Sequence, residues 1–302
     1  MPELPDVEIY VEALRERVLG RRLEHAAILS PLLLRTVDPP LDAGCGRAVV
    51  NVSRLGKRVV IELADALFLA IHLMVAGRLR WAARGAGLPG RIALAALEFE
   101  TGSLVITEAG RRKRAALHVA SGRAAVEALG AGGLEPLTCD AAPFAAVLRR
   151  ENRTLKRALT DPRLFSGIGN AYSDEILHAA RLSPVMLTSR LTDEQAARLF
   201  EATQTTLAGW IERLRAHFAG RFPGPREITA FRPGFAVHGR YGKPCQECGT
   251  FVQRIRYAEN ETNYCPRCQT EGRLLADRSL SRLLRQDWPR RIEDLHDTPP
   301  AP

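Results

Sequence analysis

Two Cys-X-X-Cys pairs constrain the fold of this 302-residue chain more than any other feature of its sequence. The pairs, Cys245/Cys248 and Cys265/Cys268, are separated by sixteen residues rich in Val, Ile, Thr and Tyr. Pairs at this spacing can close one tetrahedral zinc site, with the intervening segment folded back as a hairpin. The alternative, two redox dithiols, lacks the βαβ pattern that usually surrounds them. Because four sulfurs leave no position for water, we expect the Zn²⁺ to be structural.

The remaining composition indicates a basic protein of the cell interior. Lys and Arg outnumber Asp and Glu by 43 to 34, a net charge of +9, which favours a polyanionic partner. No signal peptide and no bilayer-length apolar run is visible, so we expect a cytoplasmic protein. Cys45 and Cys139 stand alone, and we expect both to be small buried apolar residues.

The first part of the chain combines one helix with many short strands. From Val7 to Leu19 the apolar residues recur at helical spacing, and Gly20 ends the run. Between residues 21 and 120 short runs of Val, Ile and Leu alternate with Gly-rich punctuation. We expect a β-sandwich or barrel packed against the helix and ending in the Gly130 to Gly133 cluster.

The middle of the chain reads as helical. Asp140 opens a helix that stops before Asp161-Pro162, and a further helix runs from Thr192 to about Ala219. Residues 222–234 contain three prolines and read as a mobile loop or linker. The inward residues of the first helix are Phe144, Val147, Leu148, Leu155 and Leu159, and its basic face is Arg149, Arg153, Lys156 and Arg157.

Between these helices, Gly167-Ile168-Gly169-Asn170 permits a tight turn that leads into a helix. The free backbone N–H groups at such a helix start, together with the Asn170 amide, can bind a phosphate. A plain turn between helices is the alternative. The sequence thus predicts an α+β protein with domains at residues 1–130, 131–235 and 236–270, and an extension at 271–302.

The amino terminus carries the residues best suited to chemistry. Removal of Met1 would leave Pro2 with a free secondary amine, whose pKa is roughly 8, and an attack on a carbonyl-level carbon would give a cationic iminium. Glu3 is close enough to move protons at the reacting carbon and its ring oxygen. The alternative is that Pro2 and Pro5 only rigidify the start of a helix.

These stretches, in this order, resemble the Fpg/Nei family, the formamidopyrimidine-DNA glycosylases and endonuclease VIII. The resemblance covers residues 1–269 and includes Pro2 to Glu8, Lys57, Gly167 to Glu175 and the four cysteines. It implies a bifunctional glycosylase and AP lyase that removes oxidised bases from duplex DNA. We therefore expect a monomeric bacterial protein that is associated with the nucleoid through its binding of DNA with damaged bases or abasic sites. The family resemblance also implies an N-terminal helix with a β-sandwich, a helix-two-turn-helix domain and a C-terminal four-cysteine zinc-finger hairpin.

The resemblance also assigns roles to single residues. Pro2 would attack the sugar C1′, and Glu3 would shuttle protons. Lys57, otherwise an ordinary solvated loop lysine, would contact the phosphate of the lesion and support catalysis. Lys156 and Asn170 would hold backbone phosphates, because an everted nucleotide needs its flanking phosphates fixed.

Two groups of residues depart from the family pattern. Asn260 stands where relatives carry a phosphate-binding arginine at the finger tip, so that Arg254 or Arg256 would have to substitute. Val75 stands in place of a methionine wedge, with Met74 one residue away, and Lys113 replaces a phenylalanine wedge, while Arg111 matches the arginine that reads the orphaned base. We expect a weaker grip on DNA and an altered opposite-base preference.

The chain also continues past the point where relatives usually stop. Asp277 is expected to cap a helix that carries Leu280, Leu283, Leu284 and Trp288 on one face. That face would dock on the protein itself, or else bind a partner or DNA, and residues 297–302 are expected to be disordered.

Two functional classes follow from the sequence. The first is a base-excision-repair enzyme, and the second is a protein of the same fold that binds damaged or distorted DNA, with AP lyase activity only or without base excision. Intact Pro2, Glu3 and Lys57 favour the enzyme. An RNA-binding zinc-ribbon protein is a third class that no sequence feature supports.

Overall fold

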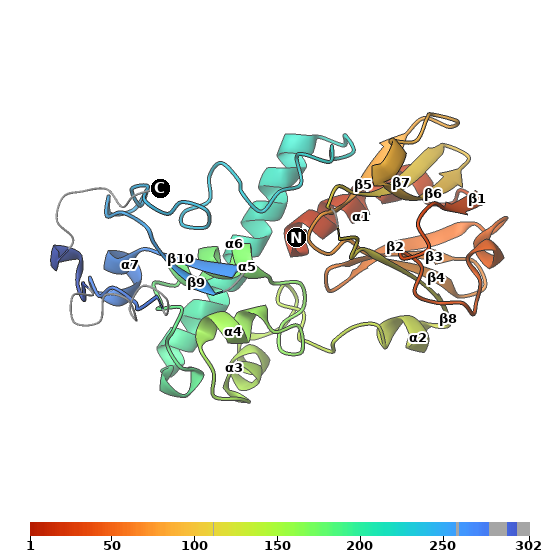
Figure 1. The fold of residues 1–302 in the computed structure, drawn as a ribbon. Helices are drawn as coiled ribbons and strands as arrows, with labels where there is room; N and C mark the ends of the chain where they lie inside the picture. Colours follow the sequence, from red (N-terminus) through yellow and green to blue (C-terminus); the bar gives the residue numbers. More distant parts are fainter. Residues whose placement is uncertain (111, 258–259, 278–288, 295–302) are drawn as a thin grey trace. The chain divides into compact units, whose positions relative to one another are not determined.

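The computed structural model describes residues 1–110, 112–257, 260–277 and 289–294. It forms two compact units, shown in Figure 1. The first unit comprises Met1–Gly132 and Gly209–Ala230, and the second comprises Gly133–Ala208 and Phe231–Pro302. We had predicted that residues 209–230 belong to the helical domain at 131–235. In the structure their contacts group them with the first unit.

The first unit is a sandwich of two antiparallel four-stranded sheets. The sheets share one apolar core, to which Leu69 and Ile71 contribute from one side and Leu97 and Leu104 from the other, which confirms the predicted β-sandwich. The first sheet has the order β1 (Leu23–Ile28), β6 (Ala93–Phe99), β7 (Gly102–Glu108) and β5 (Gly77–Ala82), and the second has the order β2 (Val49–Leu55), β3 (Arg58–Leu63), β4 (Leu67–His72) and β8 (Ala116–Ser121).

Helix α1 (Leu4–Val18) packs on β2 and β3. It begins three residues before the predicted Val7, because proline is accepted in a first helical turn and because Glu3 and Asp6 form a capping box. Tyr10 and Leu14 lie on its fully buried face. The amino terminus is therefore fixed to the apolar core of the sandwich.

The second sheet also has a covered outer face. Val60, Phe68 and Ala70 form a small apolar cluster there with Val126 of helix α2 (Arg123–Glu127). Both faces of β4 are consequently buried over most of its length.

The second unit contains helices and the finger hairpin. Its elements are α3 (Ala141–Arg149), α4 (Leu155–Thr160), α5 (Asn170–Ala179), the first part of α6 (Asp193–Phe218), β9 (Gln253–Tyr257), β10 (Asn260–Tyr264) and α7 (Pro266–Thr270). Across both units, the described residues form short 3-10 turns at Leu41–Gly44, Gly90–Ile92, Thr188–Arg190 and Ile292–Asp294. Helix α6 agrees with its predicted range, and Thr192 and Gln195 cap its start reciprocally.

The predicted single helix from Asp140 to residue 160 was wrong. The chain breaks after Arg149 and restarts with Thr154 as the N-cap residue of α4. Thr154 forms a β-bridge with Leu187, and the Arg153 N–H donates to the Thr188 hydroxyl. These tertiary contacts replace the intrahelical hydrogen bonds that a continuous helix would have made.

The structure also bears on the predicted loop, on the two single cysteines and on membrane-spanning helices. Residues 222–234 lack regular structure, but Ile228 is buried and the Phe222 ring packs against Tyr10, so the first half of this segment is anchored. Cys45 and Cys139 are half-buried, not buried as expected. In the described part of the chain, no helix has the length and apolar character needed to cross a membrane.

Candidate functional site

The amino terminus forms the first part of the site. Pro2 is buried, and Glu3 is only 3% exposed. The Glu3 N–H donates to Asp6 Oδ2 at 2.8 Å, and the Glu3 carbonyl accepts the Val7 N–H at 3.0 Å. The start of α1 thus holds Glu3 in one conformation beside Pro2.

The surrounding charges define the environment of the terminal amine. Burial lowers the pKa of the Met1 amine; nearby Glu3 and Asp6 oppose this effect, while Arg78 and Lys57 add to it. Lys57 lies in the β2–β3 turn after Gly56, whose φ is 61°. The structure therefore brings Glu3 and Lys57 to the amino terminus, where removal of Met1 would expose the Pro2 nitrogen.

The β4–β5 turn presents Val75 to solvent. Val75 is 56% exposed, whereas Met74 is half-buried with a left-handed φ of 53°. The turn closes tightly at Gly77, where an added Cβ would lie 2.2 Å from the Leu73 carbonyl oxygen. Of the two possible wedge residues, Val75 is the one that points outward.

The β7–β8 loop is organised by a buried carboxylate that the sequence did not single out. Glu108 Oε2 accepts the N–H groups of Arg114 and Ala115 at 2.9 and 3.1 Å, and the Lys113 amine folds back onto the Glu108 carbonyl. Arg111 lies outside the described residues. The Lys113 side chain thus supports its own loop.

In the second unit, Lys156 is buried, with 9% exposure. Its amine donates to Asp174 Oδ1 and, at 2.6 Å, to the Asn170 carbonyl. Asn170 begins α5, and its side-chain amide donates to the Glu261 carbonyl of β10 at 2.9 Å. The expected exposed basic face was therefore wrong at Lys156, and both predicted phosphate contacts are engaged in internal hydrogen bonds.

Two adjacent acids of α5 connect the helical domain to the finger. Asp174 Oδ2 lies 2.7 Å from His238 Nδ1 and accepts the Asn263 N–H at 3.1 Å. Glu175 accepts the N–H groups of residues 236–238 at 2.6 to 2.9 Å. Burial raises the pKa of Glu175, and the three N–H donors oppose that shift. Sequence reasoning missed these roles, although two acids inside an otherwise buried helix are an unusual pattern.

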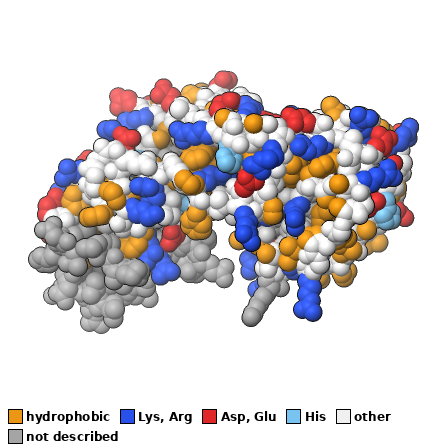
Figure 2. Space-filling view, turned by 90° about the horizontal axis from the view of Figure 1, so that it is seen from above, with side chains coloured by type: hydrophobic (Ala, Val, Ile, Leu, Met, Phe, Trp, Pro, Cys, Tyr) orange, Lys and Arg blue, Asp and Glu red, His pale blue; other side chains and the backbone are white. Residues whose placement is uncertain are grey.

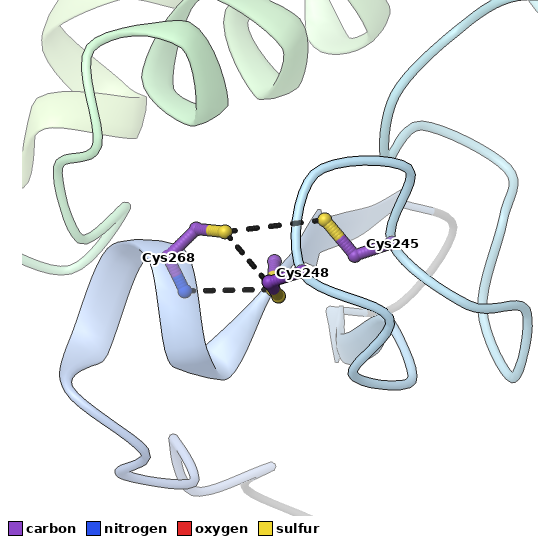
Figure 3. Close-up of side chains that lie close together, drawn as sticks. Cys245, Cys248 and Cys268 are labelled. Atoms are coloured by element: carbon purple, nitrogen blue, oxygen red, sulfur yellow. Dashed lines mark hydrogen bonds between the residues drawn. The ribbon is translucent and has the colours of Figure 1, made fainter.

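The four finger cysteines form a compact sulfur cluster. Their Sγ atoms all lie within 4.8 Å of one another, and Cys245 and Cys265 are buried. Figure 3 shows Cys245, Cys248 and Cys268 directed toward one another. Such a set matches a tetrahedral zinc–thiolate site, so the predicted structural Zn²⁺ is confirmed and the metal has no open position.

The β9–β10 hairpin of the finger carries Asn260 and its two basic neighbours, Arg254 and Arg256. Asn260 begins β10 opposite Tyr257, directly after residues 258–259, which lie outside the described residues. The Arg254 guanidinium lies 4.0 Å from the Tyr241 ring centroid and 3.8 Å from Glu261. Arg256 is exposed.

The described parts of the extension contact the finger. Asp277 Oδ2 accepts the Arg256 N–H at 2.7 Å, and the Leu275 N–H donates to the Tyr264 hydroxyl at 2.8 Å. Arg273 pairs with Arg291 in an antiparallel bridge. Residues 278–288, including the apolar face expected at Leu280 to Trp288, and residues 297–302 lie outside the described residues.

Comparison with known proteins identifies the family. Residues 1–129 match the formamidopyrimidine-DNA glycosylase N-terminal domain, residues 133–217 its H2TH domain, and residues 242–270 the zinc finger found in FPG and IleRS. The chain therefore belongs to the formamidopyrimidine-DNA glycosylase family, as the sequence resemblance indicated.

Similar proteins are known in sequence and in structure. The formamidopyrimidine-DNA glycosylases of Variovorax paradoxus and Thermus thermophilus are 33% and 34% identical, over 89% and 90% of this chain and all of each relative. A crystal structure of Lactococcus lactis FPG with FAPY-dG containing DNA is 25% identical, with a TM-score of 0.78 over 89% of this chain and 100% of that one.

Proposed function

We propose that the chain is a DNA glycosylase with AP lyase activity that excises oxidised bases from duplex DNA. The observation that carries the proposal is a pair of buried residues, Pro2 and Glu3, at an amino terminus whose amine responds to the charge of Lys57, in a chain of this family. Mere binding of damaged DNA would not need an amine at that position. The relatives named formamidopyrimidine-DNA glycosylase, and the similar structure with FAPY-dG containing DNA, support the substrate class.

The reaction needs one nucleophile and one proton shuttle. After removal of Met1, the Pro2 lone pair forms a bond to C1′ while the N-glycosidic bond breaks and the base leaves with a proton. The amine loses its proton, Glu3 protonates O4′, and the C1′–O4′ bond opens to an iminium. Loss of a C2′ proton then delivers electrons to this sink, and the 3′ phosphate departs; a second elimination would release the 5′ phosphate.

The other predicted residues would hold the DNA. A phosphate bound at Asn170 would replace the Glu261 carbonyl as the acceptor of its amide. Lys156, fixed by Asp174, would serve the same strand, and Arg111 would read the orphaned base. Wedge residues with little apolar bulk, Val75 and Lys113, favour a weak opposite-base preference. Excision of one lesion opposite each of the four bases tests this preference, and a strong preference for cytosine would contradict it.

The finger tip would determine the strength of the grip. Because the chain carries Asn260 there, Arg254 and Arg256 are the basic side chains nearest to it in sequence on β9. Asn260→Arg should tighten binding of lesion DNA and change the ratio of the two elimination products. An unchanged affinity and product pattern would contradict this role for the tip.

Borohydride trapping separates enzyme from binding protein. The wild-type chain should form a covalent adduct with duplexes that contain oxidised purines, oxidised pyrimidines or abasic sites, and Pro2→Ala should form none. Trapping of abasic DNA alone would support the lyase and contradict the glycosylase. A mature chain that retains Met1 and still cleaves would refute the mechanism. Monomeric state and cytoplasmic, nucleoid-associated location stay predictions.

A further inference from the structure

An arginine and two histidines gather on the outer face of the second sheet. Arg58 of β3 lies directly opposite His72 of β4, whose partner on β8 is Ala116. His118 lies two residues further along β8, and therefore on the same face. The apolar cluster under α2 occupies the other end of this face. Strands β3, β4 and β8 thus carry an apolar end and a basic end on this face.

Neighbouring groups extend the basic end. The Arg35 N–H donates to the Leu117 carbonyl at 2.9 Å, which holds exposed Arg35 along the outer edge of β8, where Leu34 bridges to Leu117. Burial lowers the pKa of His72 to about 4, with further lowering by Arg58, Lys57 and His118. Burial, Arg58 and Arg35 lower the pKa of His118. Among the described residues, the neighbouring side chains that lower the pKa values of the two histidines are all basic.

The group is not satisfied by its own contacts. Arg58 Nε and His118 Nδ1 are enclosed, and neither has a hydrogen-bond partner among the described residues. Glu62, the acid of β3 on this face, is already paired with Arg123 at 3.1 Å. An anion beside Arg58 would supply the acceptor that the enclosed guanidinium nitrogen lacks and would favour protonation of the neighbouring imidazole.

We propose that Arg58 and His118, with Arg35 at the edge, bind a backbone phosphate of duplex DNA outside the nucleotides held at the active site. The proposal rests on the proposed function, because it supplies a contact for the same DNA. A phosphodiester is a permanent anion with acceptor oxygens, which suits a guanidinium beside an imidazole. His72 and Lys57 would connect this contact to the residues at the amino terminus.

The test compares Arg58→Gln and His118→Gln in the full-length protein. Affinity for a duplex with an abasic-site analogue is measured over a range of salt concentrations, alongside the melting temperature. Arg58→Gln should weaken binding roughly fivefold and reduce the slope of log K against log salt by about one. His118→Gln should weaken binding at pH 6 more than at pH 8, because a bound phosphate favours the protonated ring and so opposes the lowering of its pKa by burial, Arg58 and Arg35. Arg123→Gln, which removes an arginine already paired on the same face, is the control and should change neither.

Different outcomes separate the possible failures. Salt slopes identical to wild type for folded Arg58→Gln and His118→Gln would overturn the phosphate site. A shift of the His118 ring resonances with inorganic phosphate but unchanged DNA binding would also overturn it, in favour of a free phosphate ligand. Wild-type protein that binds the duplex but is not trapped by borohydride would refute the proposed function and leave this contact standing.

Discussion

The two units hold their candidate site residues by different means. In the first unit, Pro2 and Glu3 begin a helix whose buried face, including Tyr10 and Leu14, belongs to the apolar core of the sandwich. In the second unit, Lys156 and Asn170 depend on buried carboxylates, backbone amides and a zinc site. An apolar frame holds its shape without a metal, whereas a polar frame fails when one partner is removed.

Removal of zinc should have the largest effect and should separate the two units. Because structural zinc contributes on the order of 10 kcal/mol to folding, Cys265→Ser should unfold the finger and abolish tight DNA binding while the sandwich stays folded. Zinc content and limited proteolysis with peptide mapping measure both effects. Cys45→Ser, in the first unit, is the matched control. Loss of both units in one transition would break the comparison.

Truncation of the central carboxylate should be the next largest change. Asp174→Ala would leave the Lys156 amine and the His238 ring buried without their common acceptor, at a cost of about 3 to 5 kcal/mol. Urea denaturation measures the loss. Asp193→Ala is the control. The Asp193 side chain is 94% exposed, so loss of its ion pair with Arg149 should lower the free energy of unfolding by less than about 1 kcal/mol. Equal decreases in the free energy of unfolding for Asp174→Ala and Asp193→Ala would show that the buried network contributes no more than an exposed ion pair.

The basic end of the second sheet should make the first unit sensitive to acid. The folded pKa of His72 is about 4, below its usual value of 6.5, so the unfolded chain binds the proton first as the pH falls. This stabilising contribution is complete above pH 6.5 and is lost toward pH 4, to the extent of about 1 to 3 kcal/mol. Urea midpoints of wild type and His72→Gln over this range measure it, and parallel curves would contradict it.

The extension should have the smallest effect. Asp277→Ala removes the acceptor for the Arg256 N–H and should destabilise the finger by about 1 kcal/mol. Hydrogen exchange at the β9 amides reports the change locally. Glu293→Ala, in the same extension but on the surface, should leave exchange unaltered. Unchanged exchange in Asp277→Ala would show that the extension does not support the hairpin.

The sequence predicted those parts of the molecule that depend on local signals. Cysteine spacing predicted the zinc site, short runs of Val, Ile and Leu between Gly-rich stretches predicted the sandwich, and Thr192 marked the start of α6. The start of α1 was placed late, because its apolar period begins at Val7 although the capping box lies at Glu3 and Asp6.

The parts that failed depend on contacts distant in sequence. Nothing local shows that Thr154 pairs with Leu187 and breaks a helix, or that Lys156 meets Asp174. The basic face that includes Lys156 was predicted from the helical spacing of its residues alone. That spacing indicates which side of a helix a residue lies on, but not which distant residue it contacts. The roles of Glu108 and Glu175 in accepting backbone N–H groups were invisible for the same reason.

In the Leu73 to Gly77 turn, the backbone path and the side chain at the apex are determined independently. Its backbone path is fixed by the close approach of Gly77 to the Leu73 carbonyl, while the Val75 side chain at its apex touches little else. Substitution of Val75 should therefore leave the backbone path of the turn unchanged, whereas substitution of Gly77 should not.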